Sequence, residues 1–425
     1  MPPAFKSKRF LLYWIGQLVS IAGSQMQLWA LYWHLRILSD QPMIISGIGL
    51  ARFLPVILLS LVAGIVADRF NRRKITIITQ IALGCIALIL GLGTWRGIIS
   101  LWMLFGLVAV QSVAVAFDVP ARQALIPSLV PREDLANAYS LNSIASKVGG
   151  ILGPAISGAV IAYLGLQWAY WINAISYLAV IIALIAIGHV RQVVENTSFN
   201  ATGALQEIQA GIEFIKSSPI ILSAMILDFF GSFFSSANTL LPFVARDILH
   251  VGPIQYGWLS ASQSIGTLFV GLYLSQKTKL RRQGMLISVS VIMFGLATIL
   301  FGLSTSFWLS MAALILIGVF DGLSTIIRNT VRQLQTPDAM RGRMMSITQI
   351  FFKGGPQLGE TESGLVAQIL GVPFAIISGG VGCVFAAGIV IKKYPQLWAH
   401  NSEENVQDAL DSNTASVLGR QTTRG

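Results

Sequence analysis

The chain has 425 residues, of which 54% are hydrophobic and only 11% are charged. Soluble domains carry about 25% charged residues, so this composition excludes a water-soluble globular protein and predicts a polytopic membrane protein. The formal net charge of +11 does not predict a nucleic-acid groove, because the basic residues lie in short connections between apolar stretches, where they orient a membrane protein.

Twelve apolar stretches are long enough to cross a bilayer, which requires about 20 residues per helix. They lie near residues 10–33, 43–66, 75–94, 99–118, 138–164, 168–188, 220–244, 254–276, 285–304, 307–327, 343–370 and 373–391. The sequence therefore predicts an all-α membrane protein with twelve transmembrane helices.

Lys and Arg are distributed unequally between the two sets of connections. With both termini inside, 21 of them lie in or near the inner connections, whereas the outer ones hold three, Arg36, Arg96 and Arg246. Positively charged connections stay in the cytoplasm, so both termini are expected there. In a bacterium, the corresponding location is the plasma (inner) membrane.

Four segments are expected from the polarity of the chain. Two six-helix bundles, at 1–188 and 220–392, flank a cytoplasmic linker at 189–219. Within the linker, apolar residues recur at spacings of three and four from residue 204 to residue 216, which predicts an amphipathic helix on the membrane surface. The tail at 393–425 is mostly polar and is expected to be disordered.

The two bundles carry an internal repeat. Residues 122–165 and 328–371 match at 13 of 44 positions without a gap, including Gly158 with Gly364 and Gly165 with Gly371. Both copies run from the inner side outward, so the repeat is parallel. Two parallel six-helix repeats around a central cavity are one plan of secondary transporters.

A charged cluster joins the second and third predicted helices. It consists of Gly64, Asp68, Arg69, Arg72 and Arg73. One interpretation is a solvated loop that only orients the protein. The alternative is a cytoplasmic latch, in which Asp68 pairs with the other bundle in one conformation and so biases a two-state equilibrium.

The fifth predicted helix is rich in small residues. Gly149, Gly153 and Gly158 have no side chains that hold neighbouring helices apart, and such spacing permits close backbone approach. Pro154 removes one helical hydrogen bond and favours a kink. We expect this helix to pack tightly against the eighth helix and to close the interface between the bundles.

Among the ionisable residues in the predicted spans, four are candidates for the proton or substrate pathway. They are Arg52, Asp228, Glu360 and Glu362. Each costs on the order of 3 kcal/mol to insert, so such residues are functional candidates by default. Because residues two apart point about 200° away from each other on a helix, only one of the two glutamates can face the cavity.

Structural ion pairs are the competing interpretation for these carboxylates, for instance between Glu362 and Lys147 or Lys353. Asp118 and Asp321 are expected as helix-end partners of Arg122 or Arg328.

Two further features point to the cavity and its substrate. In the first helix, Gln17 and Ser24 share a polar face, which suits a wet pathway or the adhesion of helices. In the seventh, Phe229, Phe230 and Phe233 favour an amphiphilic, ring-containing substrate.

These motifs resemble those of the major facilitator superfamily over residues 10–392. The Gly64 to Lys74 segment is similar to its signature between helices 2 and 3, with Asn71 where the family usually has glycine. The segment from Gly149 to Gly158 resembles its antiporter motif, with Ser157 in place of one glycine. The Asp118 to Asn137 stretch is similar to the branch that contains macrolide-type drug efflux proteins and the enterobactin exporter.

The resemblance implies a secondary transporter that exports a small amphiphilic molecule, such as a drug or a siderophore, by proton-coupled antiport. The arginine usual in helix 4 of proton-coupled drug antiporters is absent, with Val108 in its place, so that residue's proton role does not carry over. Nutrient uptake, or a non-transporting role in assembly or pigment delivery, are the alternatives.

No enzymatic activity, catalytic residue, metal site or cofactor is expected. The sequence holds no phosphate-binding Gly-x-x-x-x-Gly-Lys-Ser/Thr loop, so ATP is not expected to drive transport directly. The expected partners are the substrate, protons and the bilayer, without nucleic acid, and the chain is expected to act as a monomer.

Overall fold

The computed structural model describes residues 2–188, 209, 211–234, 238–277, 281–336 and 341–399, and within these ranges the regular elements are all helical. The first half consists of α1 (Lys8–Leu38), α2 (Pro42–Ser46), α3 (Ile48–Arg69), α4 (Arg72–Trp95), α5 (Leu101–Leu125), α6 (Leu135–Tyr163) and α7 (Leu166–Ile187). The second half contains α9 (Pro219–Phe234), α10 (Leu241–Phe243), α11 (Pro253–Ser275), α12 (Gln283–Leu303), α13 (Phe307–Gln335), α14 (Arg341–Leu370) and α15 (Val372–Lys393), followed by the short α16 (Pro395–Ala399).

Each of the twelve predicted ranges is mostly helical among its described residues. Among the described residues, eight helices are long and apolar enough to cross a membrane, or nine if the bent pair Gly211–Ser217 and Pro219–Phe234 is one span. The long helices α1, α11 and α14 are not in this set, since their apolar residues alternate with polar side chains. The all-helical class is confirmed, and the count of twelve spans stays a prediction.

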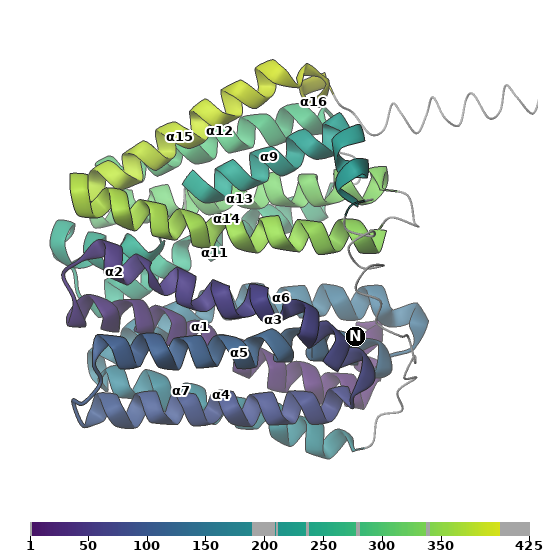
Figure 1. Cartoon of the computed structure of the whole chain (residues 1–425), viewed down its shortest axis with the longest axis vertical. Helices are drawn as coiled ribbons and strands as arrows, with labels where there is room; N and C mark the ends of the chain where they lie inside the picture. The colour runs from purple at the N-terminus through teal and green to yellow at the C-terminus, as the bar shows by residue number, and fades with distance from the viewer. Residues whose placement is uncertain are drawn as a thin grey trace, which may run out of the picture.

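The two halves lie side by side, the first below and the second above in Figure 1. The parallel repeat is visible in their packing, because α6 packs along α1 and α11 while α14 packs along α9 and α2. The matched glycines Gly165 and Gly371 end equivalent connections with φ angles of 99° and 90°. Only glycine adopts this backbone readily, so the matched glycines of the sequence repeat mark a matched local structure.

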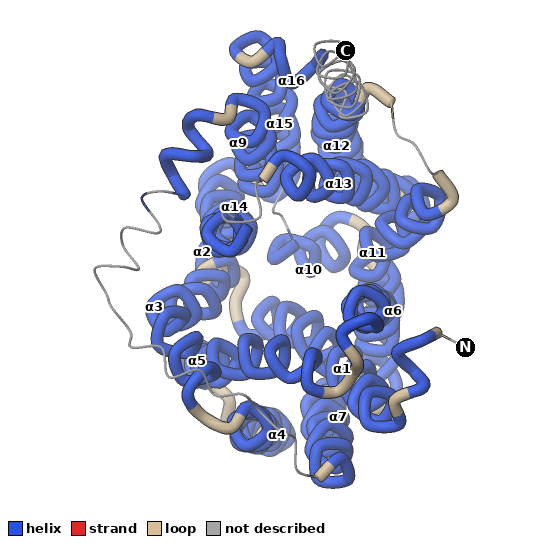
Figure 2. The backbone as a smooth tube through the Cα atoms, turned by 90° about the vertical axis from the view of Figure 1, so that its right-hand side faces the viewer, coloured by secondary structure: helices blue, strands red, loops and turns tan. Residues whose placement is uncertain are grey.

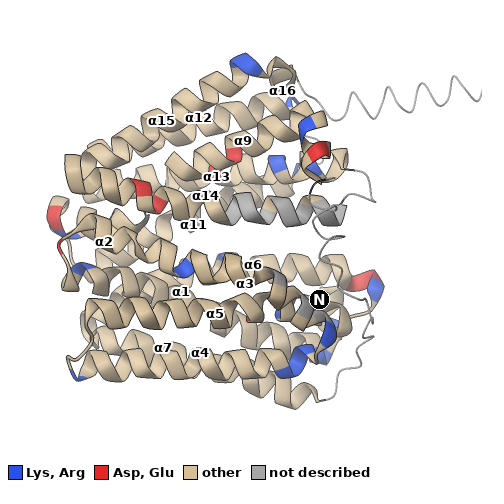
Figure 3. Cartoon of the chain, viewed as in Figure 1, with Lys and Arg blue, Asp and Glu red and all other residues tan. Residues whose placement is uncertain are grey.

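The bundle has two unlike ends. The basic end holds the start of α1, the α3–α4 connection and the end of α15, and most Lys and Arg gather there in Figure 3. The short-loop end holds the connections at 39–41, 96–100 and 249–252.

The hydrophobic core shows where the halves meet. At the short-loop end one core cluster contains residues of both halves, such as Leu31, Ile45, Phe243 and Tyr256. Toward the basic end the first half has its own cluster around Tyr13 and Leu184, and the second half has another around Ile327 and Val390. The halves are therefore joined at the short-loop end and separate toward the basic end, where Figure 2 shows helices arranged around a central region.

Three local features concern the continuity and the ends of these helices. Helix α14 continues through Gly354, Gly355 and Pro356, since neighbouring helices and local adjustments compensate for the one hydrogen bond that proline removes. The seventh predicted span is helical in α9 up to Phe234 and again from Asn238, and the three residues between them lie outside the described ranges, so its continuity stays a prediction. Asn71, which stands where the family usually has glycine, has φ −64° and accepts a hydrogen bond from the Lys74 amide as the N-cap of α4.

Parts of the expected linker and tail lie outside the described residues. Of the predicted amphipathic helix, only residue 209 and residues 211–217 are described, and Gly211–Ser217 is helical and bent by 104° from α9. Residues 400–425 of the tail also lie outside the described ranges.

Candidate functional site

The first half walls a cavity of about 670 Å³ that reaches Gln357 of the second half. Polar side chains line much of it: Ser20, Ser24, Gln25, Gln27, Arg52, Gln80, Gln111, Ser112, Asp118, Arg122, Tyr177 and Gln357. All of these except Gln357 of α14 belong to the first half. A volume in the range of small-molecule sites, with one wall of hydrogen-bonding groups, can hold a polar or amphiphilic molecule.

A chain of amides holds the middle of this wall. Gln27 Nε2 donates to Gln111 Oε1 at 2.9 Å, and Asn173 Nδ2 donates to Gln27 Oε1 at 2.6 Å. The Asn173 amide also reaches Tyr177 OH at 3.3 Å, and Ser24 Oγ donates to the same hydroxyl at 3.2 Å. Because each member is held by a neighbour, α1, α5 and α7 present a fixed polar surface to the cavity.

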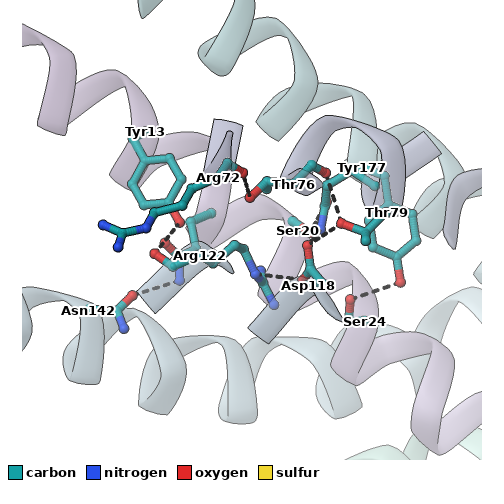
Figure 4. A network of polar contacts seen from close by, with 12 residues as sticks. Tyr13, Ser20, Ser24, Arg72, Thr76, Thr79, Asp118, Arg122, Asn142 and Tyr177 are labelled. Carbon is teal, nitrogen blue, oxygen red and sulfur yellow. Dashed lines mark hydrogen bonds and ion pairs between the residues drawn. The ribbon is translucent and has the colours of Figure 1, made fainter. Parts of the chain in front are cut away.

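Asp118 is fully buried, more than any other charged side chain that is described in the first half. Its carboxylate accepts from Thr79 Oγ1 at 2.8 Å and Gln80 Nε2 at 3.0 Å, and it pairs with Arg122 Nε at 2.7 Å. Figure 4 shows this network, in which α4 and α5 supply the partners. The expected helix-end pairing of Asp118 with Arg122 is confirmed, and it leaves the pair close to neutral overall.

One polar contact crosses between the halves beside the cavity. Arg52 Nη1 donates to Tyr32 OH at 2.8 Å, and Tyr32 OH donates to Glu360 Oε1 at 3.5 Å. Glu360 is buried, and its other oxygen, Oε2, has no hydrogen-bond partner among the described residues. An ionised carboxylate with an unsatisfied buried oxygen is costly, so protonation of Glu360 would change the stability of this interface.

Asp228 lies in a different place from the large cavity. It pairs with Arg328 at 2.6 Å, and both side chains are buried within the second half. The pair borders a void of about 10 Å³, which also touches Asp321 and Ser324. Arg328 was expected to pair with Asp321, and the structure corrects its partner to Asp228 because α9 brings that carboxylate across to α13.

The remaining predicted pathway residues separate into two groups. Ser24 and Arg52 line the cavity. Gln17 is not among the lining residues, and its Nε2 donates to Asn142 of α6 at 2.7 Å. Glu362 is half-buried and makes no ion pair with any described side chain, on a face of α14 shared with exposed Leu358 and Leu365. The side chain of Lys353, one of its expected partners, lies outside the described residues.

The glycines of α6, which is the fifth predicted helix, pack against two different helices. A Cβ atom on Gly153 would lie 2.7 Å from the Ala22 carbonyl oxygen of α1, and Gly149 is similarly close to Ile21. Gly158 instead faces α11, where a Cβ atom would lie 3.0 Å from the Cα of Gly257. The expected contact with the eighth predicted helix, α11, is therefore made by Gly158 and the Pro154 carbonyl. Gly153 instead packs α6 against α1 within the first half.

We predict that Gly158→Leu lowers the transport rate at least about tenfold while each half stays folded. Added bulk at such a contact destabilises a protein by roughly 1–3 kcal/mol. At Gly158 the bulk destabilises the conformation that is closed at the short-loop end. The rate is measured at equal membrane abundance. Gly106→Leu is the matched control, since nothing lies within 4 Å of a Cβ at Gly106. Normal transport by Gly158→Leu would show that this closure is not required.

The α3–α4 connection is tied into the first half. Arg72 donates to the carbonyl oxygens of Ala67 at 3.1 Å and Ala124 at 3.0 Å, and Arg73 donates to that of Leu184 at 2.7 Å. Gly64 has open space around it. The Asp68 side chain lies outside the described residues, so its pairing with the second half stays a prediction.

Polar contacts close the short-loop end between the halves. Arg36 of α1 pairs with Asp247 at 2.9 Å and also with Asp40, and its guanidinium lies 4.7 Å from the Phe243 ring centroid. Ser46 and Thr239 share a hydrogen bond of 3.0 Å. These contacts and the shared core make this end the closed one.

Several residues of the site were not predicted. Tyr32, Gln111 and Asn173 are polar side chains in apolar helices, and this signal was already visible in the sequence. The sequence did not show that α1, α5 and α7 bring them together. Tyr32 in particular is recognised only from the structure, because its partner Glu360 is 328 positions away.

The sequence is similar to that of known membrane transport proteins over most of its length. The model of the transmembrane secretion effector family matches residues 2–418. Macrolide efflux protein A of Streptococcus pyogenes is 23% identical over 86% of this chain and 90% of that protein. Enterobactin exporter EntS of Citrobacter koseri is 27% identical over 75% of this chain and 76% of that protein.

The fold has solved counterparts. The crystal structure of a bacterial homologue of the human lysosomal transporter Spinster, in an inward-facing and occupied conformation, has a TM-score of 0.71 at 15% identity and covers 92% of this chain and 97% of that one. The similarity at this identity concerns the fold. The match of the family model over nearly the whole sequence shows that the chain belongs to the transmembrane secretion effector family of the major facilitator superfamily, whose members are transporters and not enzymes.

Proposed function

We propose that this protein exports a small amphiphilic molecule from the cytoplasm of a bacterium by alternating access, in exchange for protons. The observation that carries the proposal is a polar cavity of about 670 Å³ that the first half walls and that reaches the second half, in a fold whose halves share a core at one end only. Such a cavity is reached from one side of the membrane at a time when the halves rock about it. The similarity to a macrolide efflux protein and to an enterobactin exporter supports the outward direction.

The basic end faces the cytoplasm in this proposal, as the positive-inside rule requires. Both termini then lie in the cytoplasm, and the protein is a multi-pass component of the inner membrane. The structure with its closed short-loop end corresponds to the state that loads substrate from inside. The cluster of Gly64, Asp68, Arg69, Arg72 and Arg73 lies at this basic end, where a latch would regulate reopening.

Proton coupling is proposed to act through Glu360. When Glu360 is charged, Tyr32 links it to Arg52, and this link joins the second half to the first. When Glu360 binds a proton, the attraction to Arg52 is lost and the free energy of the joined state changes. A ligand that alters one of two conformations shifts their populations, so a proton gradient can drive the cycle.

The experiment compares the accumulation of radiolabelled erythromycin and of enterobactin in cells with and without the protein. Export lowers accumulation, and an uncoupler that collapses the proton gradient removes this difference. If accumulation is higher with the protein than without it, the direction is import. If neither probe responds, enterobactin-like and macrolide-like substrates are both excluded.

A further inference from the structure

A long groove runs along the exposed surface of the second half between α9 and α15. Its volume is about 400 Å³. One wall is the stripe Ile226, Phe230 and Phe234 of α9, and the other contains Phe385, Ile389 and Lys393 of α15. The groove is separate from the substrate cavity, which shares none of these residues.

The lining of this groove is apolar over most of its length. Phe385 and Ile389 are strongly exposed on α15. Gly382 lets the ring of Phe234 approach α15, because a Cβ atom at Gly382 would lie 2.7 Å from Phe234 Cδ1. In a membrane protein, the surface between two such stripes faces hydrocarbon chains.

The length of the groove matches one leaflet of a bilayer. Its lining runs from Gly382 to Lys393 on α15, and eleven residues at 1.5 Å each give about 16 Å. The hydrocarbon core is about 30 Å thick, so the groove reaches from the surface of the leaflet at the basic end to about the middle of the membrane.

A cation marks the surface end of the groove. Lys393 is exposed and makes no ion pair with any described carboxylate, and its Nζ lies 5.8 Å from the Tyr394 ring centroid. Tyr394 follows directly and Trp398 lies in α16, and such aromatic residues are enriched at the level of lipid headgroups. The Lys393 ammonium is therefore placed where a phosphate group of a lipid lies.

We propose that this groove is a binding site for one anionic phospholipid from the leaflet at the basic end. An acyl chain occupies the stripe from Ile389 to Phe234, and the headgroup phosphate pairs with Lys393. Basic pockets between transmembrane helices recognise anionic lipids in this way. The apolar stripe along the groove binds an acyl chain, and the positive charge of Lys393 favours an anionic headgroup over a zwitterionic one.

The test is native mass spectrometry of the protein in detergent with equal amounts of phosphatidylglycerol and phosphatidylcholine that carry the same acyl chains. We expect wild type to retain phosphatidylglycerol over phosphatidylcholine by roughly fivefold. Lys393→Gln should bring this ratio to about one, whereas Lys393→Arg should keep it. Ile389→Trp, which fills the groove, should lower the occupancy of both lipids.

The neighbouring positions supply matched controls. Lys392→Gln removes a neighbouring exposed lysine that does not line the groove, and Val381→Trp places the same bulk on an exposed position of α15 outside it. Both should behave as wild type, and free glycerol phosphate should not displace the lipid. Equal binding of the two lipids by wild type, or an equal loss in Lys392→Gln and Lys393→Gln, would overturn the proposal.

Discussion

Glu360→Gln is expected to abolish transport driven by a pH gradient while leaving the protein folded and able to bind substrate. Glutamine has the size of glutamic acid and can still accept the Tyr32 hydrogen bond, but it cannot bind and release a proton. The buried position of Glu360 and its contact across the two halves make this loss specific for coupling. The measurement uses proteoliposomes with an entrapped pH-sensitive dye and erythromycin or enterobactin as the transported probe.

Glu362→Gln is the matched control, because it makes the same chemical change two residues away. Glu362 faces away from the cavity with Leu358 and Leu365 on α14, so its variant should keep at least half of the wild-type coupling. A severe effect of Glu362→Gln with a mild effect of Glu360→Gln would place the coupling carboxylate on the other face. Full coupling in both variants would make both carboxylates structural.

The contact of Tyr32 offers an independent check of the same mechanism. Tyr32→Phe removes the hydroxyl that joins Arg52 to Glu360 and keeps the aromatic ring in the core. If the link acts as proposed, this variant transports with a weaker dependence on the pH gradient but binds the probe normally. An unchanged dependence would show that Glu360 acts without Tyr32.

Much of the fold was predictable because it follows from local patterns. Apolar runs of spanning length gave the positions of the helices, and matched glycines such as Gly165 and Gly371 gave the parallel repeat. These signals work because the bilayer requires internally satisfied, apolar helices. The exceptions are local too, since neighbouring helices keep α14 helical through Pro356.

The candidate site was predictable only in part. The cost of charges in membranes identified Arg52, Asp228 and Glu360 as residues with special roles, but it did not distinguish a cavity from a structural ion pair. That distinction depends on which helices are neighbours. Glu360 reaches Tyr32 only because α14 packs on α2 and α3, and Asp228 reaches Arg328 only because α9 lies against α13.

Asp228→Asn is expected to destabilise the protein rather than to uncouple it. Removing one partner of a buried ion pair leaves an uncompensated charge, which costs about 3–5 kcal/mol. The charge left here is that of Arg328, whose side chain is buried beside a void with room for little more than one water. Thermal unfolding of the detergent-extracted protein measures the loss, and the yield of monodisperse protein should fall with it.

Two further variants separate this explanation from a role of Asp228 in proton transfer. Asp228→Asn combined with Arg328→Gln removes both charges, so it should recover much of the lost stability. Asp321→Asn is the control, since Asp321 is exposed on α13 and hydrogen bonds to Thr325. Asp321 also borders the void. The double variant Asp228→Asn/Asp321→Asn therefore tests whether Asp321 replaces Asp228 as the partner of Arg328. The opposite outcome is that Asp228→Asn, alone and combined with Asp321→Asn, unfolds at the wild-type temperature and loses only gradient-driven transport. In that case Asp228 carries a proton, and Glu360 does not act alone.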